Sequence, residues 1–432
     1  MPSKGDQAMK ELVDELQALG STYHVQKFLS SGSYGAVCAG TDAVNNPVAI
    51  KRVFNTVSDG RTVNILSDSF LGKRVLREVR LLNHFHHPNI LGLMDLILDL
   101  SPPNKHKLYL VTELMRTDLA QVISDQRIVI SKDHIQYFMY NILLGLHALH
   151  AAGVVHRDLH PGNVLLAENN DIKICDFNLA REDTTDNEKT HYVTHRWYRA
   201  PELVMQFKGF TKKVDVWSAG CVMGELFNRK ALFRGTTFYN QLNKIVETLG
   251  TPRDEDVTMF SSASARDYLH AALAKCQPKA WGEIVPLADP VALDLLSKML
   301  CFNPNHRITA EEALHHAYFA DLFDPEDLKG VMDEPFHFDE SVNEVTAMHK
   351  MFQDEVLRFQ ELRARRGRGS PYGSPTGGSG AAAAANGAAH AAAAAAAAAQ
   401  QGQAEAAAAA SGGMHDGHVR RTTSLMNLDT LH

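Results

Sequence analysis

The spacing of apolar residues near the start of the chain changes from helical to strand-like and back to helical. Residues 1–20 predict a short amphipathic helix with three leucines on one side, Leu12, Leu16 and Leu19. Residues 23–51 alternate as strands do, with breaks at glycines and at an Asn-Asn-Pro turn. Residues 73–84 return to helical spacing, and two further strands are expected at 93–99 and 107–112. A small β-rich lobe with one main helix is therefore predicted.

Beyond residue 118 the pattern becomes mainly helical. Helices are expected over five segments, 133–152, 214–228, 238–249, 290–301 and 310–317. We therefore expect an α+β protein whose small lobe precedes a large α-helical lobe. The composition changes after Arg366, because Gly, Ser, Pro, Gln and Ala dominate residues 367–432. Such a segment has too few large apolar side chains to offset chain entropy, so disorder is predicted there.

Length, charge and cysteine content exclude several classes of protein. The 432 residues suggest two or three structural units. A formal net charge of -7 argues against a dedicated nucleic-acid binder, which would carry a basic surface. The five cysteines show no metal-binding spacing, so we expect reduced thiols and a location in the cytoplasm or nucleus. No signal peptide and no apolar run of ~18 residues is found, so no membrane partner is expected.

A glycine-rich segment lies between the first two predicted strands. It reads Ser30-Ser31-Gly32-Ser33-Tyr34-Gly35-Ala36-Val37. Glycines allow backbone N–H groups to approach phosphate oxygens closely, although a simple tight hairpin explains the segment equally well. Lys51 then ends a buried strand, and a buried ammonium requires an anionic partner. Glu78 on the following helix and a nucleotide phosphate are the two candidates.

Two acids and an amide form the strongest chemical signal. Asp158 is followed by Asn163 and, after a predicted hairpin, by Asp176. Asp158 can accept a proton from a substrate hydroxyl, while Asn163 and Asp176 can supply the oxygen ligands that Mg²⁺ prefers. A polar loop with capping side chains is the weaker alternative, because Lys51 and Glu78 precede this set in the required order.

On these motifs the chain resembles the eukaryotic protein kinase superfamily. Within it, the chain is similar to the mitogen-activated protein kinases, through a Thr190-His191-Tyr192 lip and the segments Arg196–Glu202, Asp215–Cys221, Leu249–Pro252 and Arg307–Ala310. The likeness covers about residues 20–360. It implies a bilobal fold with an antiparallel N-lobe sheet and a helical C-lobe. The kinase domain would span 23–319, with the N-lobe at 23–112, the hinge at 113–117 and the C-lobe at 118–319. An N-terminal extension (1–22) would precede it, and a C-terminal extension with a docking region that packs on the kinase (320–366) and a tail (367–432) would follow.

The resemblance implies transfer of the ATP γ-phosphate to Ser/Thr-Pro sites in proteins, with ATP and Mg²⁺ as cofactors. Lys51 would hold phosphates and pair with Glu78, Asp158 would be the catalytic base, Asn163 and Asp176 would bind Mg²⁺, and Glu202 would pair with Arg307. The nucleotide-binding residues implied are Leu29, Ser30, Ser31, Gly32, Ser33, Tyr34, Gly35, Ala36, Val37, Ala49, Lys51, Glu78, Thr112, Glu113, Leu114, Met115, Asp118 and Asp176.

The same resemblance implies a regulatory switch and a docking site. An upstream dual-specificity kinase would phosphorylate Thr190 and Tyr192, although an ordinary polar loop is the alternative. The arginines that would receive these phosphates are Arg77, Arg157 and Arg181 for Thr190, and Arg196 and Arg199 for Tyr192. The acidic residues Asp324, Glu326 and Asp327 would bind basic docking peptides and phosphatases, unless they form a solvated helix end. A monomer is expected.

Several positions depart from the family pattern. His160 replaces a catalytic-loop lysine and His195 replaces its threonine partner, so we expect His160 to act in catalysis, with a protonated imidazole taking over part of the charge.

Asn178 replaces a glycine, and asparagine adopts the left-handed conformation readily, so the turn should survive. Residues 56–72 should form an extra loop above the cleft. Cys175 is either a reactive thiol beside the nucleotide or an inert packed one.

A second interpretation remains at this point. Because His160 and His195 are unusual, the chain fits a pseudokinase scaffold that binds ATP and recruits partners without efficient transfer. The intact set of Lys51, Glu78, Asp158, Asn163 and Asp176 favours an active enzyme.

Overall fold

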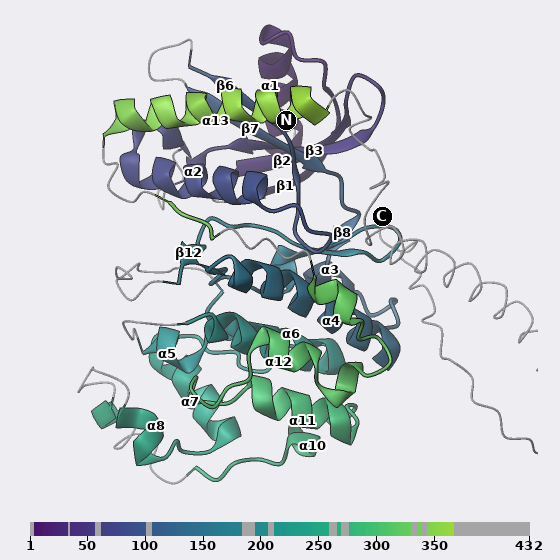
Figure 1. Cartoon of the computed structure of the whole chain (residues 1–432), viewed down its shortest axis with the longest axis vertical. Coiled ribbons are helices and arrows are strands. Elements are labelled where there is room, and N and C mark those ends of the chain that lie inside the picture. Colours follow the sequence, from purple (N-terminus) through teal and green to yellow (C-terminus); the bar gives the residue numbers. More distant parts are fainter. Residues whose placement is uncertain are drawn as a thin grey trace, which may run out of the picture.

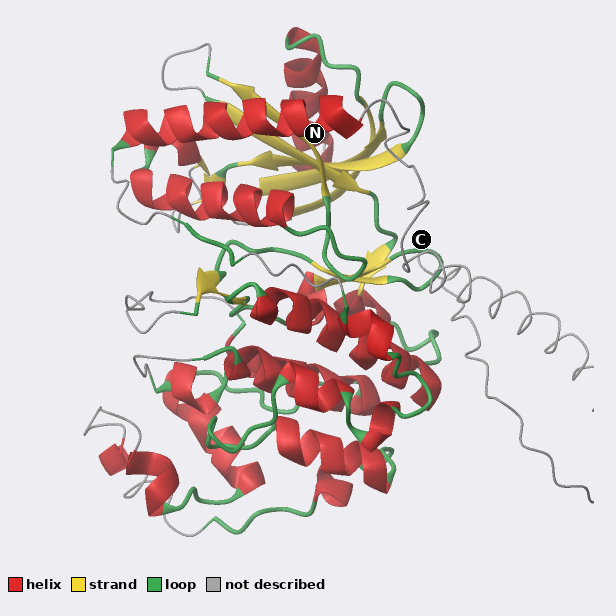
Figure 2. Ribbon diagram, viewed as in Figure 1, coloured by secondary structure: helices red, strands yellow, loops and turns green. Residues whose placement is uncertain are grey.

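The computed structural model describes residues 4–32, 35–56, 62–100, 106–183, 195–205, 211–258, 266–268, 276–329, 335–338 and 344–366. They form two lobes, an upper one built on a β-sheet and a lower one built almost entirely of helices (Figures 1 and 2). This is the bilobal α+β architecture that the sequence predicts. Within the part of the chain described, no helix has the length and apolar character needed to cross a membrane.

Five antiparallel strands form the N-lobe sheet in the order β1-β2-β3-β7-β6. Their bounds are β1 His24–Gly32, β2 Gly35–Thr41, β3 Pro47–Val53, β6 Leu93–Asp99 and β7 Lys107–Glu113. The register pairs Val37 with Lys51, and Ala49 with Thr112. Residues expected to bind nucleotide therefore lie on neighbouring strands, because the side chains of cross-strand partners point to the same face.

Helix α1, Lys4–Ala18, covers the outer face of this sheet. Leu12 and Leu16 are each 1% exposed and pack with Val48 and Ile50 of β3. Glu15 of α1 accepts a hydrogen bond from the hydroxyl of Tyr109 (2.8 Å) and pairs with Arg52. The predicted helix is confirmed, but it ends one residue before Leu19, which is exposed rather than part of the apolar face.

Helix α2, Ser69–His84, lies beneath the sheet and carries Glu78. It begins four residues earlier than its apolar spacing predicts, because the Asp68 carboxylate accepts hydrogen bonds from two N–H groups of its first turn. The long helix α13, Val345–Arg366, runs alongside α2 (Figure 1). Glu355 of α13 accepts a hydrogen bond from Asn83 at 2.9 Å and pairs with Arg80 at 3.5 Å.

The described part of the predicted 56–72 loop contains regular structure. A strand pair, β4 Asn55–Thr56 and β5 Thr62–Val63, is followed by the single 3₁₀ turn η1, Ile65–Ser67. His349 of α13 hydrogen-bonds to the carbonyl oxygen of Leu66 at 2.6 Å. The segment expected as an extra loop thus contains η1, which packs against the C-terminal extension, and its last residues form the start of α2. Residues 57–61 lie outside the described residues.

The C-lobe is organised around α4, Lys132–Ala151, and α6, Lys213–Asn228, whose buried faces form the main core. The other helices are α3 Leu119–Ser124, α5 Pro201–Val204, α7 Phe238–Leu249, α8 Asp254–Thr258, α10 Trp281–Ile284, α11 Pro290–Met299 and α12 Ala310–Leu314. Short strands β8 Thr117–Asp118, β10 Val164–Leu166 and β11 Ile172–Ile174 form a small sheet facing the N-lobe, and β9 Val154–Val155 pairs with β12 Arg181–Glu182. The five predicted helices of this lobe are present, with ends shifted by up to a few residues.

Candidate functional site

Strands β1 and β2 of the glycine-rich segment pair as an antiparallel hairpin. Ser30 pairs with Val37, Ser31 with Ala36, and Gly32 with Gly35. Gly35 has φ 152°, and a Cβ atom there would lie 2.5 Å from the carbonyl oxygen of Arg52. Glycine is therefore required at this position by close packing against β3. Ser33 and Tyr34 lie outside the described residues.

Lys51 and Glu78 form an ion pair that joins β3 to α2. The Lys51 Nζ to Glu78 Oε1 distance is 2.7 Å, and only 4% of the Glu78 side chain is exposed. Burial alone would lower the pKa of Lys51, but Glu78 and Asp176 raise it above its ordinary value. Lys51 is therefore a fixed cation that faces the carboxylate of Asp176 as well as that of Glu78.

Asp158 follows the short strand β9 and lies in the cleft. Its backbone N–H donates to His156 Nδ1 at 3.3 Å, and its carbonyl oxygen accepts from the amide of Asn163 at 2.9 Å. Burial and the neighbouring Asp176 raise the pKa of Asp158 to about 7, although Arg199 and Arg157 oppose the shift. A carboxylate with a pKa near neutrality is well matched to general-base catalysis.

The single turn η2, Pro161–Asn163, presents Asn163 next to Asp158. His160 caps this turn, since its Nδ1 accepts a hydrogen bond from the N–H of Gly162 at 3.1 Å. The amide nitrogen of Asn163 is used in the bond to Asp158, so its amide oxygen is the atom that can bind a metal. Asn163 and Asp158 are thus brought together as the sequence predicts.

His160 does not carry the charge that the sequence suggests. Its ring stacks on that of His195, with centroids 3.7 Å apart and planes inclined by 27°. Burial and the neighbouring His195 lower the pKa of His160 to about 3. The expectation of an imidazolium in place of the lysine is not supported in this structure, because an Nδ1 that accepts a hydrogen bond carries no proton and burial disfavours the charged ring.

Asp176 follows β11 and faces Lys51 across the cleft. Asn178 donates to Asp176 Oδ1 from its side-chain nitrogen at 2.6 Å and from its backbone N–H at 3.3 Å. Although burial opposes the shift, Lys51 and these hydrogen bonds lower the pKa of Asp176, which keeps it ionised. The left-handed residue of the triplet is Asp176, with φ 65°, so the turn survives without left-handed backbone at Asn178.

These residues fit a divalent cation that is shared with nucleotide phosphates. Among the described residues, no group of three or more His, Cys, Asp or Glu side chains could hold a metal alone. Asp176 and Asn163 offer two oxygen ligands, and Mg²⁺ in nucleotide sites takes few protein ligands in addition to phosphate oxygens and water. Glu78 Oε2 is buried without a hydrogen-bond partner in the described structure, so the Lys51 pair leaves an acceptor inside the cleft.

Comparison with known proteins decides what this arrangement is. A model of the protein kinase domain matches residues 23–319. The chain belongs to the protein kinase family. Its relatives include mitogen-activated protein kinase MPS1 of Pyricularia oryzae, 42% identical over 370 residues, which cover 82% of this chain and 84% of the relative. Another is mitogen-activated protein kinase spm1 of Schizosaccharomyces pombe, 40% identical over 354 residues, which cover 80% of this chain and 81% of the relative.

Solved structures of a mitogen-activated protein kinase agree with this assignment. The structure of MAP kinase LmaMPK10 from Leishmania major matches this chain with a TM-score of 0.72 and 70% sequence identity. The match covers 82% of this chain and 100% of the Leishmania chain. A second structure of the same Leishmania kinase, determined as a complex, has a TM-score of 0.67 and 66% identity, and covers 81% of this chain and 99% of its own. The kinase is therefore a serine/threonine protein kinase of the mitogen-activated type, and the scaffold alternative finds no support.

Membership of the family brings ATP, a divalent metal, protein substrates and upstream kinases with it. The residues expected to contact adenine lie at the end of β7 and just after it. Thr112 donates to the carbonyl oxygen of Glu113 at 3.3 Å, and Glu113 pairs with Lys173 at 3.1 Å. Leu114 and Met115 lead into β8, and both are partly exposed. Asp118 caps α3 by accepting from the N–H of Gln121 at 2.9 Å, a structural role that sequence reasoning missed.

Two arginines that are expected to receive the phosphate of Thr190 are buried, one in α2 and one in the loop after β9. Arg77 is 2% exposed and Arg157 is 8% exposed. Burial and the nearby charges of Arg181, Arg77 and Arg74 lower the pKa of Arg157 to about 9, although Asp215 opposes the shift. Sequence reasoning missed Arg74, which lies one helical turn before Arg77 in α2. Thr190 and Tyr192 lie outside the described residues.

The end of the activation segment is tied to the C-lobe as predicted. Arg307 donates to both oxygens of Glu202, at 2.6 and 3.0 Å, and the two side chains are 0% and 1% exposed. The guanidinium also stacks over Trp217, with 5.1 Å to the ring centroid. This network fixes the segment that follows His195.

The surroundings of Cys175 favour the inert alternative over a reactive thiol. Burial and the adjacent Asp176 raise the pKa of Cys175 far above its ordinary value. Because the thiolate is the reactive form, this cysteine is protonated at neutral pH.

The acidic residues expected to bind docking peptides lie on and around the turn η5, Pro325–Leu328. Asp324 caps the turn by accepting from the N–H of Glu326 at 2.9 Å, and Glu326 pairs with Lys329 at 2.5 Å. Asp327 accepts a hydrogen bond from Tyr140 at 2.8 Å. Asp324 and Glu326 are exposed, whereas Asp327 is half-buried and engaged within the fold.

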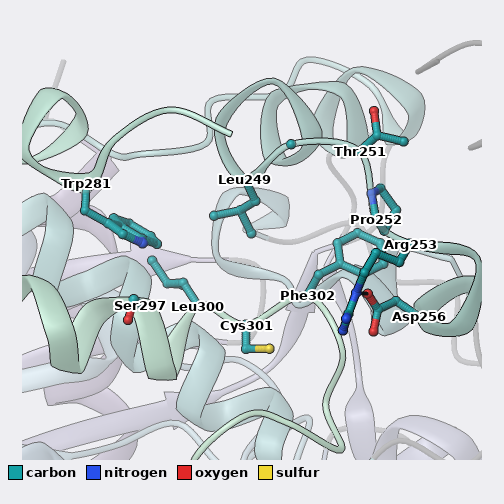
Figure 3. A pocket seen from close by; sticks show the side chains of 11 residues that line it. Leu249, Thr251, Pro252, Arg253, Asp256, Trp281, Ser297, Leu300, Cys301 and Phe302 are labelled. Atoms are coloured by element: carbon teal, nitrogen blue, oxygen red, sulfur yellow. Dashed lines mark hydrogen bonds and ion pairs between the residues drawn. The ribbon is translucent and has the colours of Figure 1, made fainter. Parts of the chain in front are cut away.

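A cavity of about 280 Å³ lies in the C-lobe, between the end of α7 and α11 (Figure 3). Arg253 and Asp256 on its wall pair at 3.2 Å, and Asn303 donates to Asp256 at 2.8 Å. None of the residues expected to bind nucleotide lines this cavity. It is therefore separate from the phosphoryl-transfer site.

Proposed function

We propose that this kinase transfers the γ-phosphate of Mg²⁺-ATP to Ser or Thr residues that precede proline in other proteins. The observation that carries the chemistry is that the charge of Asp176 acts both on Lys51, which pairs with Glu78 at 2.7 Å, and on Asp158, which is bonded to Asn163. Phosphoryl transfer needs positioning and charge stabilisation more than covalent chemistry, and these residues supply both. The preference for proline is carried over from the resemblance to mitogen-activated kinases.

Each residue then has a distinct task. Asp158 accepts the proton of the substrate hydroxyl, for which a pKa of about 7 is suited. Lys51 orients the phosphates, while Asn163 and Asp176 hold the cation. When bound, Mg²⁺ neutralises the charge that develops on the transferred group. His160 is a positioning residue in this scheme, because it caps the turn that presents Asn163.

The proposed switch is phosphorylation of Thr190 and Tyr192 by an upstream dual-specificity kinase. A phosphate adds roughly two negative charges, which need fixed cations nearby. Arg77, Arg157 and Arg181 supply them for Thr190, and their mutual repulsion is relieved when an anion binds among them. Arg196 and Arg199 are proposed to receive phospho-Tyr192.

Asp324 and Glu326 are the proposed docking residues for basic peptides of substrates, activators and phosphatases. Both are exposed and carry opposite charge to such peptides. Asp327, engaged with Tyr140, contributes less to this surface. We propose that the kinase acts as a monomer in the cytoplasm or nucleus.

The proposal is tested by labelled phosphate transfer to two peptides that differ only in having Ser-Pro or Ser-Ala. The protein phosphorylated on both lip residues is compared with Thr190→Ala and Tyr192→Phe variants treated in the same way. We expect at least about tenfold faster transfer to Ser-Pro and a comparable loss in each variant, since tenfold corresponds to about 1.4 kcal/mol. Equal rates on both peptides would overturn the proline preference. Equal rates before and after lip phosphorylation would overturn the switch.

A further inference from the structure

The side chain of Asn178 is bound directly to the carboxylate of Asp176. The side-chain nitrogen lies 2.6 Å from Asp176 Oδ1, and the backbone N–H of Asn178 lies 3.3 Å from the same oxygen. Both donors act on one oxygen, which leaves Asp176 Oδ2 to other partners. Asn178 is 3% exposed, so this contact is shielded from water.

The orientation of the amide follows from the charge of its partner. An ionised carboxylate only accepts hydrogen bonds, so the amide nitrogen must face it. The amide oxygen of Asn178 is then buried with no hydrogen-bond partner in the described structure. A buried acceptor without a partner is destabilising. The side-chain nitrogen of Asn178 therefore bonds to Asp176 although the side-chain oxygen of the same residue is buried without a partner in the described structure.

The backbone does not require asparagine at position 178. Asp176, rather than Asn178, adopts the left-handed conformation in this turn. Phe177 is fully buried and contacts His156, with ring centroids 5.3 Å apart, which already anchors the triplet in the core. What Asn178 contributes is its side-chain donor.

We infer that Asn178 is a positioning residue that raises the affinity of the kinase for the divalent cation bound with its nucleotide. The inference rests on the proposed role of Asp176 as a ligand of that cation. Asn178 holds one carboxylate oxygen and leaves the other to bind the cation. Hydrogen bonds that orient a metal ligand in this way commonly change metal affinity by roughly 10- to 100-fold.

The neighbouring Lys51 explains why such a restraint matters. Lys51 and Asp176 attract one another across the cleft. Without the amide of Asn178, the Asp176 carboxylate is free to turn towards the Lys51 ammonium, and the cation must then compete with Lys51 for it. Asn178 prevents this competition by holding Oδ1 within its own turn.

The test is a calorimetric titration of Mg²⁺ into the full chain saturated with a non-hydrolysable ATP analogue. We expect Asn178→Ala and Asn178→Gly to need at least about tenfold more Mg²⁺ for half-saturation than the unmodified kinase. Binding of adenosine, which carries no phosphate and needs no metal, is expected to stay unchanged. Half-saturation at equal or lower Mg²⁺ in both variants would overturn the inference, as would a parallel loss of adenosine binding.

Two further variants separate this inference from the proposed function. Asn170 is also a buried asparagine whose side-chain oxygen lacks a partner in the described structure, but it lies in the β10–β11 turn with φ 67°. Asn170→Gly keeps that backbone and is expected to leave the Mg²⁺ titration unchanged; a tenfold shift here as well would overturn a specific role for Asn178. Asp176→Ala is expected to abolish Mg²⁺-dependent binding. If it does not, the proposed metal role of Asp176 fails, and the inference fails with it.

Discussion

At the scale of single residues, His160 shows how a change of chemistry is accommodated in the catalytic loop. A lysine in this position would bring a charge, whereas the buried and stacked imidazole is neutral. What the ring supplies instead is an acceptor for the N–H of Gly162, which closes the turn that ends at Asn163. In this structure the side chain at position 160 therefore caps a turn and does not supply a positive charge.

This account predicts that a neutral acceptor can replace His160. Asn favours the cap position of a helical turn, so His160→Asn should keep kcat/KM within about threefold, whereas His160→Leu should lose about 1–2 kcal/mol, or roughly 5- to 30-fold. Steady-state kinetics from pH 5 to 8 check this. Both the unmodified kinase and His160→Asn should lose activity below about pH 7, where Asp158 becomes protonated. An ionisation near pH 6 that disappears in His160→Asn would contradict the neutral assignment.

The order of the candidate site residues along the chain allowed them to be proposed from sequence, and the structure pairs Lys51 with Glu78 and Asp158 with Asn163. The neutrality of His160 could not be predicted, because it depends on His195 stacking from a distant part of the chain. The hydrogen bond from Asn178 to Asp176 also could not be predicted from sequence, because residue type alone does not tell which residue of a turn adopts the left-handed conformation.

At the scale of elements, helix α1 completes the N-lobe core. Leu12 and Leu16 cover β3, the strand that carries Lys51, while Glu15 pairs with Arg52. The helical spacing of the leucines predicted the element, but not the face of the sheet to which it binds. That information lies in contacts between residues far apart in sequence.

Leu16→Ala tests the contribution of α1. Removing a buried leucine side chain commonly lowers the free energy of unfolding by about 2–5 kcal/mol, and Leu16 is 1% exposed. Urea denaturation is the measurement. Leu19→Ala is the matched control, because Leu19 is 38% exposed and should change stability by less than about 0.5 kcal/mol. Equal effects of the two substitutions would show that α1 does not pack as described.

Helix α3 depends on a residue more than a hundred positions later. Arg229 donates to four backbone carbonyl oxygens at the end of α3 and in the loop that follows, at 2.6 to 2.9 Å, those of Val122, Ile123, Asp125 and Ile128. No local pattern in the sequence predicted this cap. Asp118 caps the other end of α3, so Arg229 stabilises a helix whose first turn is held by a residue expected to bind nucleotide.

Arg229→Met should therefore destabilise the C-lobe. It removes hydrogen bonds from a charged donor, each worth roughly 1.5–3 kcal/mol, so a total loss of about 3 kcal/mol or more is expected in thermal or urea unfolding. Lys230→Met, which removes a neighbouring exposed cation, should be close to neutral. A loss of less than about 1 kcal/mol in Arg229→Met would mean that water replaces these bonds without cost.

At the scale of the whole molecule, the C-terminal extension returns to the N-lobe. Helix α13 packs beside α2, the helix that carries Glu78, and Met348 lies so close to Gly72 that a Cβ atom at this glycine would collide with its sulfur (Figure 1). The resemblance predicted an extension that packs on the kinase. Its partners on α2 and η1 became clear only from the structure, because the 56–72 segment departs from the family pattern.

The stability of the fold should also depend on pH through the half-buried histidine His87. Burial, Lys173 and His147 lower the pKa of His87 to about 4, whereas an unfolded histidine titrates near 6.5. The unfolded chain therefore binds the proton first. The stabilisation is complete above about pH 6.5 and is lost as the pH falls towards 4.

We expect His87 to account for at most about 2 kcal/mol of stability lost between pH 8 and pH 5. His87 Nδ1 accepts from the N–H of Asn89 at 3.1 Å, and an asparagine side chain can accept the same bond. His87→Asn should therefore fold normally and show a smaller loss of stability between these pH values. Urea unfolding at pH 8 and pH 5 measures the difference, and identical pH dependence in both proteins would contradict the assignment.

The most direct test of the account is single-turnover transfer of labelled γ-phosphate to a Ser-Pro peptide by the kinase phosphorylated at Thr190 and Tyr192. We predict measurable transfer that falls by at least about 100-fold in Asp158→Asn, because Asp158 acts as the general base. Asp171→Asn, an exposed acid in the β10–β11 turn, should behave like the unmodified kinase. No transfer despite bound Mg²⁺-ATP and a doubly phosphorylated lip, or transfer unaffected by Asp158→Asn, would contradict the central claim.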